Sequence, residues 1–338
     1  MSENTEAFFT VSVDAGSWQP NVETEGNPDE LHPAWKERNP HYALTETLYF
    51  NFIVPEEKLS ALLYMWHHPN LGVVSAGPLV FRGTRQDVFE ADIFDYRAWM
   101  SDADLPTDLG NIRFDNGYAI RKSGDAFDLS YKDPFNGNGF AIRQDPVSER
   151  VFWPGGKHFE QVMHVTGEVV LDNRSIPVDS YSIRDRSWGE ARLEAPVNAP
   201  PPAWITGVFN EGFAFNVTAT DDPTRQPAWG GAFDIRPQDA LKFGWIIFDG
   251  KTTAITAISK KTIYAADKLI PLELHMSLTD QLGRTFDIKG RIDASIPFSP
   301  SPNVRAIIAL ARWECDGMVG YGEVQDVQWL TSMRAAKR

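Results

Sequence analysis

The chain has 338 residues, of which 42% are hydrophobic and 23% charged, and its formal net charge at pH 7 is -14. A chain of this length exceeds what one hydrophobic core usually organises, so we expect two domains of similar size. The acidic surface repels phosphate backbones and anionic lipids, which argues against nucleic acid or a membrane surface as a partner.

The sequence shows neither a targeting signal nor the means to form a disulfide. The amino terminus is acidic and lacks the basic region and apolar core of a secretory signal. No apolar run approaches the ~20 residues that a membrane helix needs. Cys315 is the single cysteine, so the secreted disulfide-rich scaffolds are excluded. We therefore expect a cytoplasmic protein without a membrane span.

The composition predicts many short strands joined by turns. Aromatic residues make up 12% of the chain, and 25 glycines and 23 prolines interrupt it at short intervals. In chain order, residues 18–40 predict an extended lead-in segment. Residues 55–66 fit a helix after Pro55 as well as a strand, and residues 331–338 are a second helical candidate.

Alternating apolar and polar residues mark several strands with one buried face. The segments 127–132, 213–217 and 272–278 each place an apolar side chain at every second position. Turn sequences such as 115–117 and 249–250 separate the segments. The pattern therefore predicts an all-β protein.

The proline-rich stretch from Ala195 to Pro202 is the clearest linker, because consecutive prolines cannot sit inside a sheet. It divides the chain into an amino-terminal domain, 1–195, and a carboxyl-terminal domain, 196–338. Each half has room for about eight strands, enough for a barrel with a cavity. The predicted architecture is two tandem antiparallel β-barrels.

Several common catalytic signals are missing. The sequence has no P-loop, no dinucleotide-binding glycine motif and no nucleophile elbow. His67 and His68 are adjacent, so on a strand they point to opposite faces and cannot both bind one metal ion. We therefore expect no metal site.

Residues 158–189 carry the most distinctive pattern and predict a hairpin that turns at Asp172-Asn173. On the first strand His158, Glu160 and His164 share a parity, so their side chains leave the same face. His158 and Glu160 then lie about 7 Å apart, close enough to share a ligand or a water. His164 lies about 20 Å from His158 along a straight strand, too far to join them.

The second strand of this hairpin ends in Arg184-Asp185-Arg186, followed by Trp188 and Gly189. Burying three charges beside an indole is costly unless they pair with one another. Two interpretations stay open. The charges form a salt-bridged plug at a barrel end or domain interface, or Asp185 is a general acid whose pKa is set by an arginine and by burial.

The pattern in residues 158–189, with its Arg184-Asp185-Arg186-Ser187-Trp188-Gly189 end, resembles the carotenoid 1,2-hydratase (hydroxyneurosporene synthase) superfamily, including its AttH-like members. It is most similar to the branch with the R-D-R/H-S-W-G form. Segments 45–50 and 320–323 fit more loosely. The resemblance implies two lipocalin-like barrels, a ligand pocket at or between them, and chemistry without a cofactor.

Hydration, cyclisation and double-bond isomerisation of isoprenoids all need an acid and a dry aromatic wall. Following the resemblance, we expect Asp185 to be the acid and Glu160 or His158 the partner base. Arg184 would hold Asp185 or an oxyanion. The expected substrate contacts are Glu46, His164, Trp188, Trp204 and Trp245.

The predicted function is that of a cofactor-independent hydratase, isomerase or cyclase acting on a hydrophobic terpenoid-, steroid- or polyketide-like molecule. The rival hypothesis is a non-catalytic carrier with the same barrel, in which the charged motif is only structural. An interaction protein is a third alternative. In either of the first two cases we expect Arg184, Asp185 and Trp188 to be buried, with Asp185 within hydrogen-bonding reach of an arginine.

Overall fold

The computed structural model describes residues 28–31, 40–106, 109–192, 200–221, 233, 240–267, 269–330 and 333–334. These residues form two compact units. The first contains the described residues of 28–83 and 88–192, and the second contains residues 84–87 and those from 200 onward. Each unit is described by itself below.

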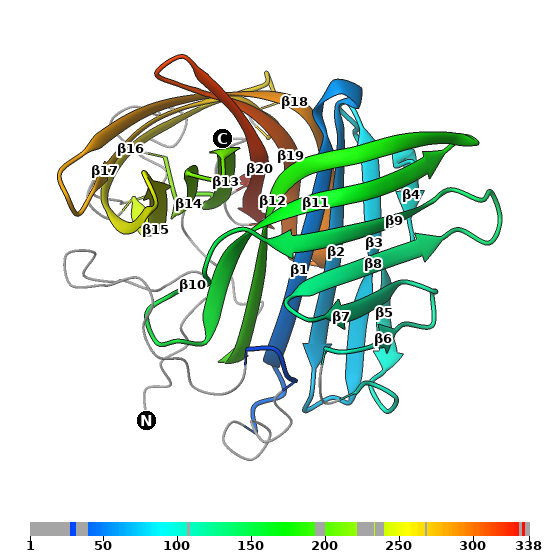
Figure 1. Ribbon diagram of the computed structural model, residues 1–338. Coiled ribbons are helices and arrows are strands. Elements are labelled where there is room, and N and C mark those ends of the chain that lie inside the picture. Colours follow the sequence, from blue (N-terminus) through cyan, green and yellow to red (C-terminus); the bar gives the residue numbers. More distant parts are fainter. Residues whose placement is uncertain are drawn as a thin grey trace. The chain divides into compact units, whose positions relative to one another are not determined.

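The first unit is one antiparallel sheet with two 3-10 turns, η1 (Pro55–Glu57) and η2 (Val88–Glu90). Its strands are β1 (Leu44–Val54), β2 (Leu59–His68), β3 (Val73–Arg82), β4 (Ile93–Phe94), β5 (Arg97–Ser101), β6 (Ile112–Arg113), β7 (Ala119–Ser123), β8 (Ala126–Lys132), β9 (Gly139–Pro146), β10 (Val151–Phe152), β11 (His158–Leu171) and β12 (Arg174–Ala191). The order β4-β3-β2-β1-β12-β11-β9-β8-β7-β6 curls into half a barrel (Figure 1). We call this unit the curled sheet.

Strand β1 shows how the sequence divides the curled sheet into two faces. Leu48, Phe50 and Phe52 belong to its hydrophobic core, and the Phe50 ring lies 5.1 Å from that of Phe127 on β8. The intervening residues, such as Tyr49, leave the other side because side chains alternate along a strand. We call these two sides the core face and the opposite face.

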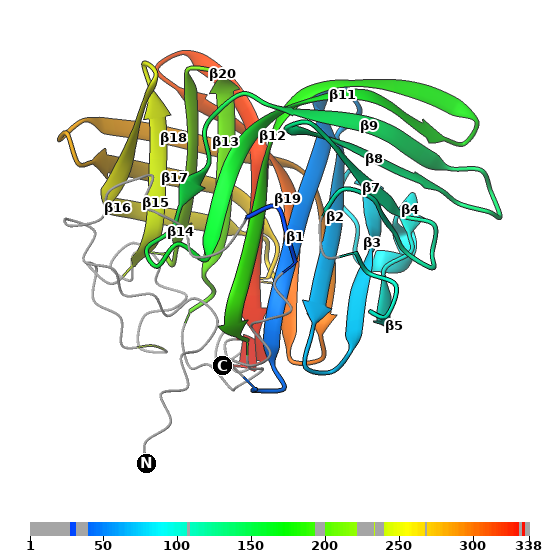
Figure 2. The same ribbon diagram turned by 60° about the horizontal axis from the view of Figure 1, so that its bottom comes forward.

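The second unit is a closed antiparallel barrel in which β20 pairs back to β13 (Figure 2). Its strands are β13 (Ala203–Asn210), β14 (Phe213–Ala219), β15 (Leu241–Phe248), β16 (Lys251–Tyr264), β17 (Pro271–Asp280), β18 (Thr285–Ser301), β19 (Val304–Cys315) and β20 (Met318–Trp329). Trp313 fills part of the core and donates a 2.8 Å hydrogen bond to the Thr206 carbonyl oxygen. Gly290 makes room for it, since a Cβ there would lie 2.1 Å from the indole.

The all-β prediction is confirmed, with a curled half-barrel sheet and a closed eight-stranded barrel. The hairpin turn at Asp172-Asn173 is also confirmed, because Leu171 pairs with Arg174 and both turn residues have left-handed backbone angles. Residues 55–66 are a short 3-10 turn followed by β2, so the helix interpretation is wrong there.

Other predictions fall on residues outside the described ranges. Residues 193–199 are among them, so the boundary between 195 and 196 stays a prediction. Most of the lead-in segment 18–40 and of the terminal helix 331–338 lies outside as well.

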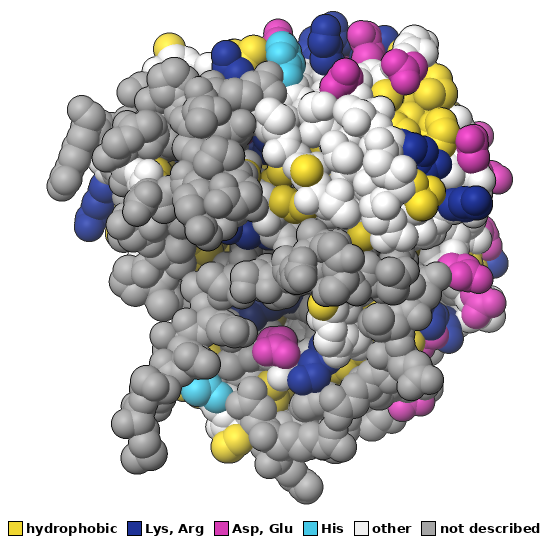
Figure 3. Space-filling view, turned by 90° about the vertical axis from the view of Figure 1, so that its left-hand side faces the viewer, with side chains coloured by type: hydrophobic (Ala, Val, Ile, Leu, Met, Phe, Trp, Pro, Cys, Tyr) yellow, Lys and Arg dark blue, Asp and Glu magenta, His cyan; other side chains and the backbone are white. Residues whose placement is uncertain are grey.

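Two features of the described residues concern possible partners: the distribution of surface charge and the length of the helices. Acidic and basic side chains lie interspersed on the described part of the face drawn in Figure 3. In the described ranges, no helix has the length and apolar character needed to cross a membrane.

Candidate functional site

Strand pairing brings the acidic residues of the predicted hairpin beside aromatic residues from the start of the sheet. Asp185 on β12 lies opposite Glu160 on β11 and opposite Tyr49 on β1. Tyr49 in turn lies opposite Tyr64 on β2. These four residues form one row across the opposite face of the curled sheet, and His158 lies next to them on β11. We call these five residues the Asp185 cluster.

The Asp185 carboxyl is the chemically perturbed group of this cluster. Burial is the main cause that raises its pKa to about 6, with the charge of Glu160 adding to the rise and His158 opposing it. The side chain still keeps partial exposure to solvent. A carboxyl with such a pKa is protonated in a useful fraction near neutral pH, as a general acid requires.

The predicted hydrogen bond between Asp185 and an arginine is not formed among the described residues. Of the arginines, Arg192 lowers the pKa of Asp185 the most, but it does so less than His158. It donates instead to the Ser187 hydroxyl. Burial therefore raises the pKa of Asp185 as a general acid requires, but the arginine partner that the motif suggested is not hydrogen-bonded to it.

Glu160 and His158 lie together, as their spacing on one strand predicted. Their Oε1 and Nε2 atoms are 3.5 Å apart, and the Glu160 side chain is 0% exposed. The Trp153 ring stands edge-on to the His158 ring at 4.4 Å. The pair thus presents a buried carboxylate and an imidazole beside Asp185, a combination that can hold and deprotonate a water molecule.

Aromatic and hydroxyl groups complete this part of the opposite face. The Tyr49 and Tyr64 rings lie 6.2 Å apart. Burial chiefly raises the pKa of Tyr64 to about 12, so its phenol stays protonated at neutral pH. In the next row, the Thr47 and Ser187 hydroxyls are hydrogen-bonded at 2.6 Å.

Sequence reasoning missed Tyr49, Tyr64, Ser187 and Arg192. Alternation places Thr47 and Tyr49 on one face of their strand, but no local signal indicates that this strand pairs with residues 185–191.

Arg184 does not belong to the Asp185 cluster, because it points to the core face. Its guanidinium donates two hydrogen bonds to Gln161 Oε1, at 2.7 and 3.1 Å. The proposed role of Arg184 in holding Asp185 is therefore wrong. Adjacent residues on a regular strand point to opposite faces, and β12 pairs with β11 without a bulge through this region.

The salt-bridged trio of Arg184, Asp185 and Arg186 is likewise not present. Arg186 pairs with Glu46 at 2.8 Å, both fully buried on the core face, and lies 5.4 Å above the Trp188 ring. Trp188 packs with Leu44 in a small buried cluster. Glu46 and Trp188, expected as substrate contacts, thus lie away from Asp185.

The other expected substrate contacts also lie outside the cluster. His164 is near the surface, with its Nε2 atom 2.8 Å from Asp179 Oδ1. Trp204 and Trp245 are buried residues of the closed barrel, on β13 and β15. Their substrate roles stay predictions.

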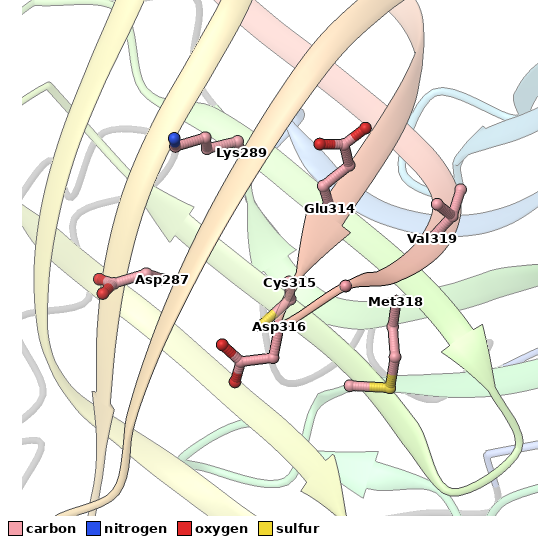
Figure 4. A pocket seen from close by; sticks show the side chains of 8 residues that line it. Asp287, Lys289, Glu314, Cys315, Asp316, Met318 and Val319 are labelled. Atoms are coloured by element: carbon pink, nitrogen blue, oxygen red, sulfur yellow. The ribbon is translucent and has the colours of Figure 1, made fainter.

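A separate hollow of about 420 Å³ opens at the β19–β20 turn (Figure 4); it is lined by Asp287, Lys289, Glu314, Cys315, Asp316, Gly317, Met318 and Val319. Burial is the largest cause that raises the pKa of the Cys315 thiol to about 11. The thiol is therefore not an activated nucleophile at neutral pH. Across the described ranges, no group of three or more His, Cys, Asp or Glu is placed to hold a metal ion.

Comparison with known proteins gives a family and a fold. A family model described as a domain of unknown function (DUF7064) matches residues 29–331. A candidate AttH protein (NE1406) of Nitrosomonas europaea has a TM-score of 0.61 and 11% identity, covering 92% of this chain and 99% of its own. Kievitone hydratase of Nectria haematococca has a TM-score of 0.53 and 13% identity, covering 92% and 97%. No curated protein matches by sequence.

Proposed function

This chain belongs to the DUF7064 family, and we propose that it is a hydratase or dehydratase acting on a hydrophobic small molecule, with Asp185 as the general acid. The observation that carries the proposal is the raised pKa of Asp185, about 6, beside Glu160 and His158. A general acid works best when its pKa lies near the working pH. The fold shared with kievitone hydratase supports the reaction class.

In the hydration direction, the Asp185 carboxyl donates its proton to one carbon of a substrate double bond. A C–H bond forms, the π bond breaks, and the neighbouring carbon becomes a cation. Water adds to that carbon and gives up a proton to Glu160 or His158, leaving the alcohol. Dehydration is the same sequence reversed, with water as the leaving group.

The neighbours of Asp185 suit a cationic transition state. Tyr49 and Tyr64 offer aromatic faces, and such faces attract cations more strongly where water is excluded. The protonated phenol of Tyr64 adds no negative charge that would trap the cation. A terpenoid-, steroid- or polyketide-like substrate fits this environment. Membership of the carotenoid 1,2-hydratase superfamily is part of the same proposal and rests on the sequence motif.

Isomerisation and cyclisation would use the same acid but no added water, and a carrier would use no acid at all. The first test therefore incubates the protein with kievitone and a panel of isoprenoid alkenes in ¹⁸O-labelled water. Mass spectrometry of the products should show one labelled oxygen in a hydrated substrate. Unlabelled isomers would redirect the proposal to an isomerase or a cyclase.

The second test assigns the acid. Asp185→Asn should lower turnover by about 100-fold or more, the usual worth of general acid catalysis, while substrate binding is kept and the melting temperature does not fall. Asp179→Asn is the matched control, because its side chain lies on the same strand and is 80% exposed. Full activity of Asp185→Asn would remove Asp185 from the mechanism. Loss of binding, stability and activity together would support a structural role.

A further inference from the structure

The core face of the curled sheet holds a buried cation that the proposed reaction does not use. Arg184 is 0% exposed, and its only hydrogen bonds among the described residues go to the neutral Gln161 Oε1. Its Nη1 atom is buried and has no hydrogen-bond partner in the part of the chain that the structure describes. A buried guanidinium in this state bears most of the cost of leaving water.

Asp29 and Asp185 both act on Arg184 through their charge, but Asp185 leaves the opposite face of β12. The carboxylates on the core face are engaged with other cations. Asp29, which acts on Arg184 through its charge, lies 2.7 Å from Arg150 and 2.9 Å from Lys122. Glu46 is paired with Arg186. Arg150 and Arg186 both add positive potential at Arg184. The described residues of this face therefore leave an excess of positive charge around the guanidinium.

Aromatic rings rather than acids surround the Arg184 guanidinium. Its central carbon lies 4.6 Å from the Phe127 ring centre and 4.9 Å from that of Phe159. Arg150 lies over the same Phe159 ring at 5.3 Å. An aromatic face attracts a cation less strongly than a carboxylate does, so the rings offset only part of the desolvation cost. They also form an apolar wall next to the charge.

We infer that the core face binds a carboxylic acid with an apolar body, whose carboxylate pairs with Arg184 and whose body packs against Phe127 and Phe159. A planar guanidinium suits a carboxylate because it offers two parallel donors, and Nη1 is the donor still available. This site is separate from the Asp185 cluster, since Arg184 and Asp185 leave opposite faces of β12 and only a weaker electrostatic influence connects them.

Calorimetric titration of the full chain with decanoate, decanol and acetate tests the inference at pH 7.5. Decanoate should bind at least tenfold more tightly than decanol, which has the same chain without the charge, and than acetate, which lacks the chain. Arg184→Met should abolish the preference for decanoate over decanol. Arg121→Met is the matched control, because its side chain is 66% exposed on β7 of the same unit; it should bind decanoate as the wild type does.

A second variant covers the case in which Arg184→Met does not fold. Gln161→Glu places a carboxylate at the position whose oxygen already accepts both Arg184 bonds, so decanoate affinity should fall at least tenfold. Asp185→Asn should leave decanoate binding unchanged, which separates this site from the proposed active site. Equal binding of decanoate and decanol to the wild type would overturn the inference, as would wild-type decanoate affinity in Arg184→Met or Gln161→Glu.

Discussion

Lys260 in the closed barrel and Arg184 in the curled sheet are both fully buried basic side chains, but their surroundings differ. In the closed barrel, Lys260 Nζ donates to Asp221 Oδ1 at 2.6 Å and to Thr262 Oγ1 at 2.9 Å. Among the described residues of the curled sheet, the Arg184 guanidinium hydrogen-bonds only to the neutral Gln161 Oε1 and lies over two aromatic rings. The first charge is neutralised within the protein, whereas the second is not. A buried charge without a counterion is the one that points to a ligand.

The buried acids of the two units repeat the contrast. Burial is the main cause that raises the pKa of both Asp326 in the barrel and Asp185 in the sheet to about 6. Asp326 accepts hydrogen bonds from the Tyr264 hydroxyl at 3.2 Å and from Gln328 Nε2 at 2.9 Å. No described residue does the same for the Asp185 carboxyl. The two carboxyl groups thus have similar pKa values, but only that of Asp326 is held by described hydrogen bonds. We therefore assign Asp326 a structural role and Asp185 a reactive one.

The largest expected effect comes from removing a neutralised cation. Lys260→Met removes the ammonium that pairs with the buried Asp221 carboxylate, so the free energy of unfolding should fall by about 3–5 kcal/mol. Arg186→Met should cost a similar amount by removing the guanidinium that pairs with the buried Glu46 carboxylate. Urea titrations would measure both, with exposed Lys251→Met as the control, expected within about 0.5 kcal/mol of wild type. A loss below about 1 kcal/mol in Lys260→Met would contradict the comparison.

The pH dependence of stability sharpens the contrast between the acids. Asp185 and Asp326 both have folded pKa values of about 6 against an ordinary 3.8. Between pH 3.8 and 6 the folded state binds more protons than the unfolded state. Each acid's contribution to the free energy of unfolding is therefore fully present below pH 3.8 and is lost as the pH rises through 6. Each acid should account for about 3 kcal/mol of this loss.

Replacing each acid by asparagine distinguishes the role of Asp185 from that of Asp326. Asp185→Asn should flatten the pH profile and stabilise the protein at pH 7, since no described hydrogen bond to the carboxyl is lost. Asp326→Asn should stabilise less, because the amide nitrogen replaces one of the two accepting oxygens and so loses the hydrogen bond from either Tyr264 or Gln328. Chemical denaturation at pH 4.5 and 7 would show both effects. If Asp326→Asn raised the free energy of unfolding more than Asp185→Asn does, the structural and reactive roles assigned to the two acids would be reversed.

The smallest effect is expected at the cation without a counterion. Arg184→Met removes the desolvation cost together with the contacts to Phe127, Phe159 and Gln161, and these nearly cancel. The unfolding free energy should change by less than about 1 kcal/mol in ligand-free protein. A loss as large as that of Arg186→Met would show that the guanidinium is a structural group.

Much of the fold could be predicted from the sequence, because periodicity and turn residues are local signals. The Asp172-Asn173 turn and the proximity of His158 to Glu160 follow from them. The same alternation places Arg184 and Asp185 on opposite faces of β12. The interpretation of the two charges as one group missed this separation. The partners Tyr49 and Tyr64 could not be found this way, because the register between β1 and β12 joins distant segments across an irregularity near Thr45.

The uninterrupted pairing of β11 and β12 also constrains how this hairpin can change in evolution. One residue inserted in β12 before Arg184 would turn the guanidinium outward and the Asp185 carboxyl inward in a single step. Both sites would be lost together, whereas a two-residue insertion would restore the parity of each. Relatives that use both faces should therefore differ in this hairpin by even numbers of residues, or by changes confined to its turn.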